Sequence, residues 1–408
     1  MLCGLLGRKL GHSYSPQIHA SLGEYEYRLF EQEPEALERF LRSENYTGLN
    51  VTIPYKKAVA SFCDVLSPVA KRLGAVNTVV KDQDGKLIGH NTDYFGFMSM
   101  VKKSGLNLNG KKVVNLGSGG ASATVLAETL DLGGFPIVIS RTGENNYQNL
   151  YRHADASILV NATPVGMYPN NGCTPIDLNT FPHLEGVLDL IYNPAHTILL
   201  QDAKERNLIS LNGLYMLVAQ AKESAEWFTG STIDDGIIEE IYNHFRFSME
   251  NVLLIGMPGS GKSTLGKILA KRLSRPFFDT DEEIVRLADK PIPEIFKEQG
   301  ETGFRKLETQ VLTELCKKSG TIIATGGGCV TVRENIPILS QNSVVVWLKR
   351  DLEQLPTEGR PLSLNADLQR MYEVRRPLYI NCADIQVNND DTVDAVAKRI
   401  IDAIMERT

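Results

Sequence analysis

A short apolar run, Val252-Leu253-Leu254-Ile255, leads directly into Gly256-Met257-Pro258-Gly259-Ser260-Gly261-Lys262-Ser263. The pattern Gly-x4-Gly-Lys-Ser between a strand and a helix is typical of a loop whose backbone N–H groups cradle nucleotide phosphates. In such a loop the Lys262 ammonium neutralises phosphoryl charge, and the Ser263 hydroxyl is a ligand for Mg²⁺. This stretch therefore predicts a P-loop α/β domain that binds ATP and Mg²⁺. The remaining residues of the predicted phosphate site are Gly259, Ser260, Gly261 and Thr264.

A second glycine-rich loop, Gly117-Ser118-Gly119-Gly120-Ala121-Ser122, follows the apolar run Val113-Val114-Asn115-Leu116. Its first two glycines would form a tight turn that aims backbone N–H groups at a pyrophosphate on the next helix N-terminus. Residues 117–121 are therefore candidates for dinucleotide binding. The third glycine of that pattern is replaced by Ser122, so this loop alone is equally compatible with an ordinary turn.

The strand expected after this loop ends in Ser140-Arg141-Thr142. An NAD site favours an acidic residue near this point, where it binds the ribose 2′-hydroxyl. Arg141 instead offers a bidentate cation for a 2′-phosphate. Without the upstream loop it would be read as a solvated surface arginine. In this context, Ser140, Arg141 and Thr142 predict NADP(H).

Length and composition limit the classes of protein that remain. At 408 residues the chain should form two or three domains, and its net charge of −6 argues against nucleic acid as a partner. No apolar run reaches the roughly 18 to 20 residues of a membrane span. The N-terminus lacks a secretion signal, and the six cysteines are too scattered for a disulfide framework or a zinc site. We expect a cytoplasmic protein with small-molecule substrates, either a monomer or a homodimer.

Short apolar runs alternate with helix-length amphipathic segments, which predicts an α/β protein with parallel sheets. The residues from Phe245 to Glu250 should separate a helix over 234–245 from a new strand, so the expected domains are 1–248 and 249–408. The other expected strands are 2–6, 48–53, 113–116, 137–140, 158–161 and 187–190, and the other expected helices are 15–22, 34–43 and 213–228.

A series of motifs in the first half resembles shikimate dehydrogenase over about residues 1–245. The resemblance implies a substrate domain of residues 1–100 and 211–248, with a Rossmann-type NADP domain of residues 101–210 inserted between them. The motifs are Ser13-Tyr14-Ser15-Pro16, Asn50-Val51-Thr52-Ile53-Pro54-Tyr55-Lys56, Gly74-Ala75-Val76-Asn77-Thr78, Gly89-His90-Asn91-Thr92-Asp93, Asn161-Ala162-Thr163-Pro164-Val165-Gly166-Met167, Tyr192-Asn193-Pro194 and Asn212-Gly213-Leu214 through Gln220.

The chemistry of these positions suits a hydroxylated ring acid. Ser13 and Ser15, near a helix start, can donate hydrogen bonds to a carboxylate. Hydride addition to a ketone produces an alkoxide, for which Lys56 is the candidate proton donor, oriented by a pair with Asp93. The plainer alternatives are a surface lysine and a helix cap. The resemblance further implies that Thr52, Asn77, Asp93 and Gln220 hold substrate hydroxyls, and that Thr163 and Met167 contact the cofactor.

The second half resembles shikimate kinase over about residues 251–405, again through motifs in order. Planar guanidinium groups suit a carboxylate, so Arg305 and Arg375 are candidates for clamping the acceptor. The motifs are Phe278-Asp279-Thr280-Asp281-x-x-Ile284, Gly300-x-x-Gly303-Phe304-Arg305-x-x-Glu308, Ala324-Thr325-Gly326-Gly327-Gly328, Arg360-Pro361-Leu362 and Arg375-Arg376-Pro377-Leu378-Tyr379.

The resemblance implies a role for five further residues of this half. Asp281 would receive the ring hydroxyl and act as general base, and Asp279 would bind Mg²⁺ or its waters. Gly327 and Gly328 would let the backbone approach the substrate. Arg360 would reach the transferred phosphoryl group from a lid. The plainer alternatives are helix caps for both aspartates and an ordinary turn for the glycines.

One departure from the kinase family concerns the lid. The segment from Leu355 to Arg360 is short and lacks the arginine that normally packs on adenine, so the adenine contacts and the nucleotide choice stay open. Two other readings also remain. The first half could be a quinate/shikimate dehydrogenase that works with NAD, and the second half could be a kinase domain of reduced or regulatory function. The leading prediction is a bifunctional enzyme that reduces 3-dehydroshikimate with NADPH and then phosphorylates shikimate with Mg-ATP.

Overall fold

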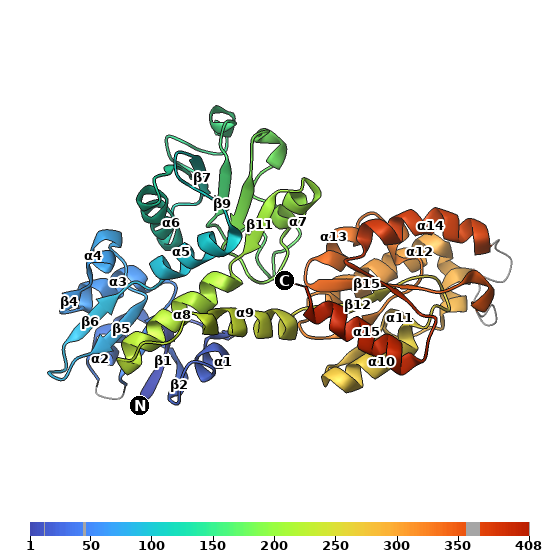
Figure 1. Cartoon of the computed structure of the whole chain (residues 1–408), viewed down its shortest axis with the longest axis horizontal. Coiled ribbons are helices and arrows are strands. Elements are labelled where there is room, and N and C mark those ends of the chain that lie inside the picture. The colour runs from blue at the N-terminus through green and yellow to red at the C-terminus, as the bar shows by residue number, and fades with distance from the viewer. Residues whose placement is uncertain (12, 44–45, 356–367, 408) are drawn as a thin grey trace. The chain divides into compact units, whose positions relative to one another are not determined.

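The computed structural model describes residues 1–11, 13–43, 46–355 and 368–407. The chain divides into two compact units, one of Met1–Tyr192 with Asp202–His244, and one of Asn193–Gln201 with Phe245–Thr408. Each unit alternates strands with helices (Figure 1). The predicted α/β class is therefore confirmed.

The first unit begins with a six-stranded mixed sheet in the order β2-β1-β3-β5-β6-β4. Strand β1 pairs in parallel with β2 and β3, whereas β5 runs antiparallel to β3 and β6. Short helices follow most of these strands. The elements are β1 (Leu2–Gly7), α1 (Ser15–Ala20), β2 (Glu26–Glu31), α2 (Leu37–Arg42), β3 (Gly48–Val51), α3 (Lys56–Phe62), β4 (Val65–Leu66), α4 (Pro68–Leu73), β5 (Thr78–Lys81) and β6 (Leu87–His90).

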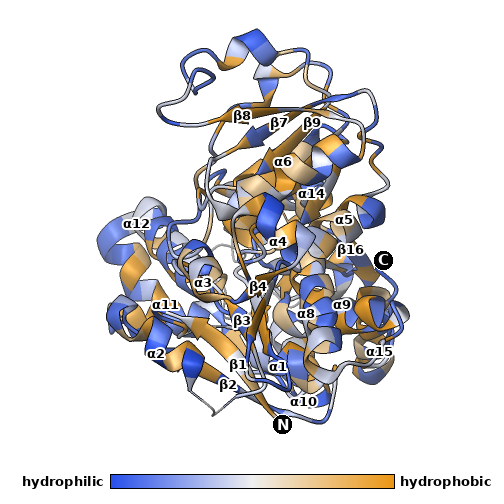
Figure 2. Cartoon of the chain, turned by 90° about the vertical axis from the view of Figure 1, so that its left-hand side faces the viewer, coloured by the Kyte–Doolittle hydropathy of each residue, from blue (hydrophilic) through white to orange (hydrophobic). Residues whose placement is uncertain are grey.

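A second sheet of the same unit has five parallel strands in the order β11-β10-β9-β7-β8. The inner strands β7 and β9 are buried along most of their length and are mainly apolar (Figure 2), as expected for parallel strands covered on both faces, whereas the edge strand β8 is only partly buried. The elements are α5 (Asp93–Ser104), β7 (Lys112–Leu116), α6 (Gly120–Asp131), β8 (Phe135–Ile139), β9 (Ile158–Asn161), β10 (Gly186–Asp189), α7 (Ile198–Glu205) and β11 (Ile209–Asn212).

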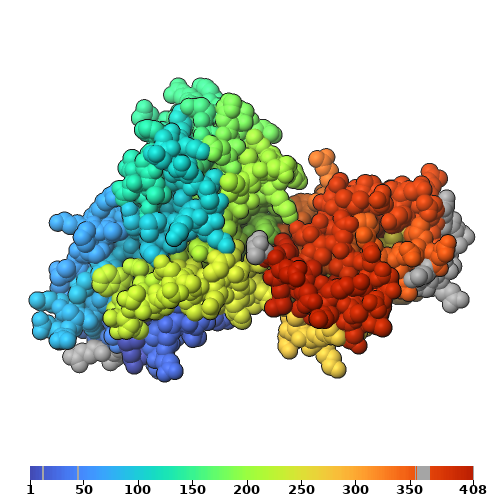
Figure 3. All heavy atoms as spheres, viewed as in Figure 1, coloured from blue at the N-terminus to red at the C-terminus, as the bar shows by residue number. Residues whose placement is uncertain are grey.

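Helix α8 (Leu214–Thr229) brings the chain back to the first sheet. It packs against α5 and α1 and against strands β3 and β5. In Figure 3 its atoms lie between those of the blue N-terminal residues and the cyan residues around α5. One helix thus contacts the strands next to Thr52 and Asn77 as well as the helix that begins at Asp93.

A buried carboxyl group on α6 should make the stability of this unit depend on pH. The Glu128 side chain is buried, and its Oε1 has no hydrogen-bond partner among the described residues. Burial, reinforced by the charge of Asp131 and opposed by that of Arg72, raises the pKa of Glu128 from 4.5 to about 8. The folded state therefore binds more protons than the unfolded state between these two values.

We accordingly expect the free energy of unfolding to fall as pH rises from about 4.5 to 8, by up to about 1.4 kcal/mol per pH unit. Glu128→Gln removes the titration and should flatten this slope, leaving the variant more stable than the wild type at pH 8.5. Thermal unfolding of both proteins between pH 5 and 8.5 measures the effect. Parallel curves over that range would contradict it.

The second unit has a five-stranded parallel sheet in the order β13-β14-β12-β15-β16. Strand β12 lies at its centre, so the P-loop leaves the sheet at the carboxyl end of the middle strand. The elements are β12 (Asn251–Ile255), α10 (Lys262–Leu273), β13 (Phe277–Asp279), α11 (Thr280–Ala288), α12 (Ile292–Leu315), β14 (Ile322–Ala324), α13 (Asn335–Ser340), β15 (Ser343–Lys349), α14 (Leu368–Cys382), β16 (Ile385–Asn388) and α15 (Val393–Met405).

The predicted linker between the two halves is wrong. Helix α9 (Gly236–Met249) continues through it, and only Glu250 separates α9 from β12. The reason is an apolar stripe at helical spacing, which keeps the chain helical beyond Phe245. Its buried members are Ile238, Ile241, Tyr242, Phe245 and Met249.

The other predicted elements agree with the structure to within a few residues. The largest shift is at 34–43, where a 3₁₀ turn (Pro34–Ala36) precedes α2. No helix of the described residues is both long enough and apolar enough to cross a bilayer.

Candidate active sites

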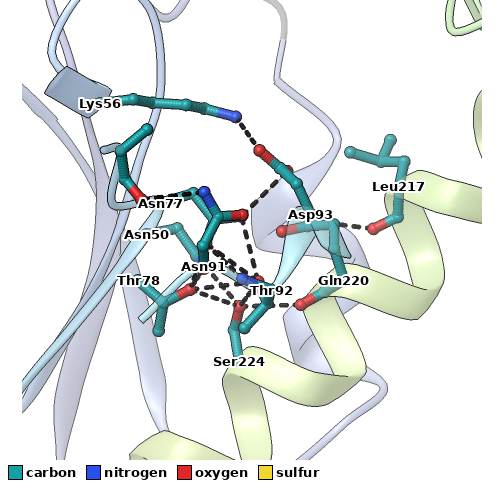
Figure 4. Close-up of polar contacts among 11 residues, drawn as sticks. Asn50, Lys56, Asn77, Thr78, Asn91, Thr92, Asp93, Leu217, Gln220 and Ser224 are labelled. Carbon is teal, nitrogen blue, oxygen red and sulfur yellow. Dashed lines mark hydrogen bonds and ion pairs between the residues drawn. The ribbon is translucent and has the colours of Figure 1, made fainter. Parts of the chain in front are cut away.

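The first candidate site centres on an ion pair between two helix starts. Lys56 is the first residue of α3 and Asp93 the first residue of α5, and Lys56 Nζ lies 2.5 Å from Asp93 Oδ2 (Figure 4). The Asp93 side chain is 11% exposed and that of Lys56 is 23% exposed, so the pair is shielded yet open to a small molecule. The structure thus brings the two residues together, although 37 positions separate them.

Asn77 lies beside this pair with a fixed amide orientation. The backbone N–H of Thr92 donates to Asn77 Oδ1 at 2.7 Å, and a backbone N–H can only donate. Asn77 Nδ2 must therefore face the other way, where it donates to Asp93 Oδ1 at 2.9 Å. One carboxylate oxygen of Asp93 thus contacts an ammonium and the other an amide, and both hold it in one rotamer.

The other predicted substrate residues of this half lie on neighbouring elements. Ser15 is the first residue of α1, and its backbone N–H donates to Ser13 Oγ at 3.2 Å. Thr52 directly follows β3, with its backbone N–H on Leu6 O. Gln220 lies on α8 and donates from Nε2 to Leu217 O at 2.9 Å.

The glycine-rich loop has the geometry that its sequence predicts. Gly117 has a φ of 105°, and a Cβ there would lie 3.0 Å from Thr163 Cγ2. Gly119 caps the N-terminus of α6, and a Cβ at Gly119 or Gly120 would meet open space. Ser118 and Ala121 complete this turn, so exposed N–H groups and a helix N-terminus suit a pyrophosphate.

Ser122, in the position of the missing third glycine, is buried and accepts a hydrogen bond from Asn115 Nδ2 at 2.6 Å. This bond ties α6 to β7 by a different means from the close backbone contact that a glycine allows. No local pattern predicts it, because Asn115 stands inside an otherwise apolar strand.

The remaining predicted cofactor residues lie at the carboxyl ends of β8 and β9. Ser140 directly follows β8, and Arg141 and Thr142 continue into an exposed loop. Thr163 Oγ1 donates to Asn161 Oδ1 at 2.7 Å. Met167, six residues after the end of β9, is 45% exposed.

The second candidate site is a pocket of about 660 Å³ over the carboxyl end of the parallel sheet. Gly261, with a φ of 95°, caps the N-terminus of α10. Lys262 Nζ donates to Gly256 O and Met257 O, both at 2.9 Å. The predicted residues that line the pocket are Gly259, Gly261, Lys262, Ser263, Thr264, Asp279, Asp281, Arg305, Gly327, Gly328 and Arg375.

Two oxygen groups in this pocket fit a magnesium ion. Ser263 Oγ lies 2.5 Å from Asp279 Oδ2, and the same carboxylate accepts the backbone N–H of Asp281 through Oδ1 at 3.0 Å. Asp279 is therefore also a helix cap. Mg²⁺ is commonly held by one or two such groups together with substrate phosphates. Among the described residues, no cluster of three or more His, Cys, Asp or Glu side chains could hold a metal.

Two arginines that the sequence predicts to bind the acceptor line this pocket. Arg305 Nη1 lies 2.8 Å from Glu308 Oε2, and Arg375 Nη1 donates to Gly327 O at 3.2 Å. Burial, only partly offset by the charge of Arg305, raises the pKa of the Glu308 carboxyl. Glu308 is the last residue of the motif that begins at Gly300, but the sequence alone predicted no role for it. Its bond to Arg305 holds that guanidinium toward the pocket.

The glycine run 326–328 has a packing reason in addition to the predicted substrate approach. A Cβ at Gly328 would lie 2.1 Å from Arg305 Nη2, and one at Gly327 would lie 2.6 Å from Pro258 Cδ. Any side chain would therefore displace the guanidinium or the P-loop.

The pocket differs from the predicted site at Ser260 and at Arg350. Ser260 is fully buried and does not line the pocket, and its carbonyl accepts a hydrogen bond from Asn389 Nδ2 at 2.7 Å. Arg360 lies outside the described residues. Arg350 directly follows β15 and lines the pocket, but it lies outside the motifs that resemble shikimate kinase.

Two family models match the chain. The model of the shikimate dehydrogenase substrate binding domain matches residues 5–79, and the shikimate kinase model matches residues 258–405. A shikimate dehydrogenase (NADP(+)) of Clostridium perfringens is 35% identical over 267 residues, a match that covers 60% of this chain and 98% of the relative.

Two solved structures extend the comparison. Shikimate dehydrogenase 1 of Peptoclostridium difficile matches with 38% identity and a TM-score of 0.56, over 60% of this chain and 97% of its own. Shikimate 5-dehydrogenase of Thermus thermophilus, in complex with NADP(H) and shikimate, matches with 32% identity and a TM-score of 0.55, over 60% and 99%. The chain belongs to the shikimate dehydrogenase family and carries a shikimate kinase domain fused behind the dehydrogenase.

Proposed function

We propose that this bifunctional shikimate-pathway enzyme catalyses two consecutive steps on one ring. The first half reduces the ketone of 3-dehydroshikimate with NADPH, and the second half phosphorylates the 3-hydroxyl of shikimate with Mg-ATP. The observation that carries the first assignment is the Lys56–Asp93 pair held by Asn77. The order is chemically natural, because the reduced ketone becomes the hydroxyl that is phosphorylated.

In the reductase, the bound NADPH supplies the hydride. The Lys56 ammonium lies where it can donate a proton to the developing alkoxide, and Asp93 keeps that ammonium in place. Asn77, Thr52 and Gln220 bind the ring hydroxyls. Ser13 and Ser15, beside the start of α1, bind the carboxylate.

In the kinase, Arg305 and Arg375 bind the shikimate carboxylate at one end of the pocket. Asp281 accepts the proton of the attacking hydroxyl. Lys262 moves from its carbonyl partners to the phosphates, whose charge it offsets. Ser263 and Asp279 would hold Mg²⁺, which would offset negative charge on the phosphates of the nucleotide.

The proposed domains are residues 1–248 for the dehydrogenase and 249–408 for the kinase. Within the dehydrogenase, residues 1–100 and 211–248 form the substrate domain and residues 101–210 the NADP domain. A reducing, cytoplasmic location is part of the proposal, supported by six cysteines that are all free thiols.

Cofactor choice separates this proposal from an NAD-dependent quinate/shikimate dehydrogenase. Arg141→Ala should raise the KM for NADPH about tenfold or more, because a charge-assisted bond to the 2′-phosphate is lost, and should leave the KM for NADH unchanged. Steady-state kinetics with both cofactors measure this. Arg152→Ala, an exposed arginine of the same lobe, is the matched control. Wild-type affinity for NADPH in the Arg141 variant would refute the assignment.

Each half of the proposal is tested by its own assay. NADPH oxidation should require 3-dehydroshikimate, and ATP-dependent phosphate transfer should require shikimate. A folded protein that performs the first reaction but transfers no phosphate to shikimate would favour a kinase domain of regulatory function. Failure of the first reaction would refute the reductase assignment.

A further inference from the structure

A buried cluster of hydroxyl and amide groups lies directly beneath the Lys56–Asp93 pair. Its members come from β3, β5, the start of α5 and helix α8, and all are at most 5% exposed (Figure 4). The segments that meet there are far apart in the chain, with 174 positions between the first and last members. The members are Asn50, Asn77, Thr78, Thr92 and Ser224.

Ser224 lies at the centre of this cluster, with four polar neighbours. Its Oγ lies 2.8 Å from Gln220 O, 2.7 Å from Asn50 Nδ2, and 3.0 Å from the hydroxyls of both Thr78 and Thr92. A serine hydroxyl has one proton and two lone pairs. The proton goes to the Gln220 carbonyl, which can only accept. One lone pair accepts from the Asn50 amide, which can only donate, and the other accepts from one of the threonines.

The same count of donors and acceptors assigns hydrogen bonds to the other members of the cluster. Asn50 Nδ2 donates one hydrogen to Ser224 and the other to Thr78 Oγ1 at 3.2 Å. Both threonine hydroxyls lie 3.2 Å from Asn77 Oδ1, so the threonine that does not donate to Ser224 can donate to Asn77. Without the Ser224 hydroxyl, a buried amide hydrogen of Asn50 loses its acceptor, and the two threonine hydroxyls have only Asn77 Oδ1 and each other as acceptors within the cluster.

The cluster also extends to two proposed substrate residues, Ser15, which would bind the carboxylate, and Gln220, which would bind a ring hydroxyl. Tyr27 Oη donates to Asn50 Oδ1 at 2.8 Å, and the Tyr27 hydroxyl also contacts Ser15. Gln220 lies one helical turn before Ser224 on α8, and its own carbonyl is the acceptor of the Ser224 proton. Ser224 therefore connects the helix that carries Gln220 with β3 and with β5, which begins directly after Asn77.

We propose that Ser224 is a positioning residue of the reductase, which sets Gln220 and the Asn77–Asp93 pair at the spacing of the substrate's hydroxyl groups. This inference rests on the proposed reduction of 3-dehydroshikimate. The Ser224 hydroxyl does not touch the substrate, because its three hydrogen-bonding positions are all taken within the protein.

The test compares the full-length wild type with Ser224→Ala, Ser224→Thr and Ser99→Ala. Ser99 is the matched control, because its hydroxyl makes the same bond to the carbonyl four residues earlier, Phe95 O at 2.8 Å, but lies outside the cluster. Ser224→Ala should raise the KM for 3-dehydroshikimate about five- to tenfold, without changing the KM for NADPH or the kinase rate. Ser224→Thr keeps a hydroxyl and should recover at least half of the lost kcat/KM. Ser99→Ala should match the wild type.

Three results would overturn the inference. The first is a wild-type KM for 3-dehydroshikimate in Ser224→Ala. The second is a parallel loss of melting temperature, NADPH binding and substrate binding in that variant, which would indicate a purely structural role. The third is a Ser224→Thr variant whose kcat/KM is no better than that of Ser224→Ala. A wild-type protein that does not reduce 3-dehydroshikimate would instead refute the proposed function itself.

Discussion

Lys56→Ala should reduce kcat for 3-dehydroshikimate reduction by about 10²- to 10⁴-fold, the usual contribution of a positioned proton donor. The loss is expected mainly in kcat, because the ammonium is required where negative charge develops on the ketone oxygen. ATP-dependent phosphorylation of added shikimate should be unchanged, since Lys56 and the P-loop pocket belong to different compact units.

The neighbouring residue provides the control for this substitution. Lys57 is an exposed lysine of the same helix, and Lys57→Ala should retain wild-type activity in both assays. NADPH oxidation and shikimate phosphorylation are measured on the same preparation of each variant, together with its melting temperature. A folded Lys56→Ala protein that has lost both activities would contradict two independent sites, and one with full reductase activity would exclude Lys56 as the proton donor.

Lys262→Ala should give the reciprocal result, a loss of kinase kcat of about 10²- to 10³-fold with the reductase unaffected. The Lys262 side chain is buried among loop carbonyls, and no other described lysine lines this pocket. Lys271→Ala on the exposed face of α10 is the control. Initial rates of shikimate phosphorylation and of NADPH oxidation measure the two halves. Unimpaired phosphorylation by Lys262→Ala would contradict the assigned role.

Local sequence predicted the features that depend on local backbone chemistry. The glycine loops are examples, because a positive φ at Gly117 and at Gly261 is a property of the residue and its neighbours. The strands that lead into the two loops were predicted from continuous apolar runs. The predicted linker failed because an apolar stripe that continues through Met249 keeps α9 helical beyond Phe245.

The supporting contacts of both sites could not be predicted from the sequence. Asn50 opens a recognised motif and Ser224 lies within an ordinary helix, but only the packing of α8 on β3 and β5 brings the two into contact. Glu308 stood within a recognised motif, yet its bond to Arg305 and its burial appear only in three dimensions. Family motifs supplied the residues expected to touch substrate, whereas the groups that orient them follow from the fold.

The central claim is that both steps act on one ring in sequence, and a single time course tests it. The protein is given 3-dehydroshikimate, NADPH and Mg-ATP together, and shikimate and shikimate 3-phosphate are followed by chromatography. Shikimate 3-phosphate should form only when NADPH is present, and at completion one NADPH should have been oxidised for each phosphate transferred. Shikimate that accumulates without any 3-phosphate, or a phosphorylated product formed without NADPH, would contradict it.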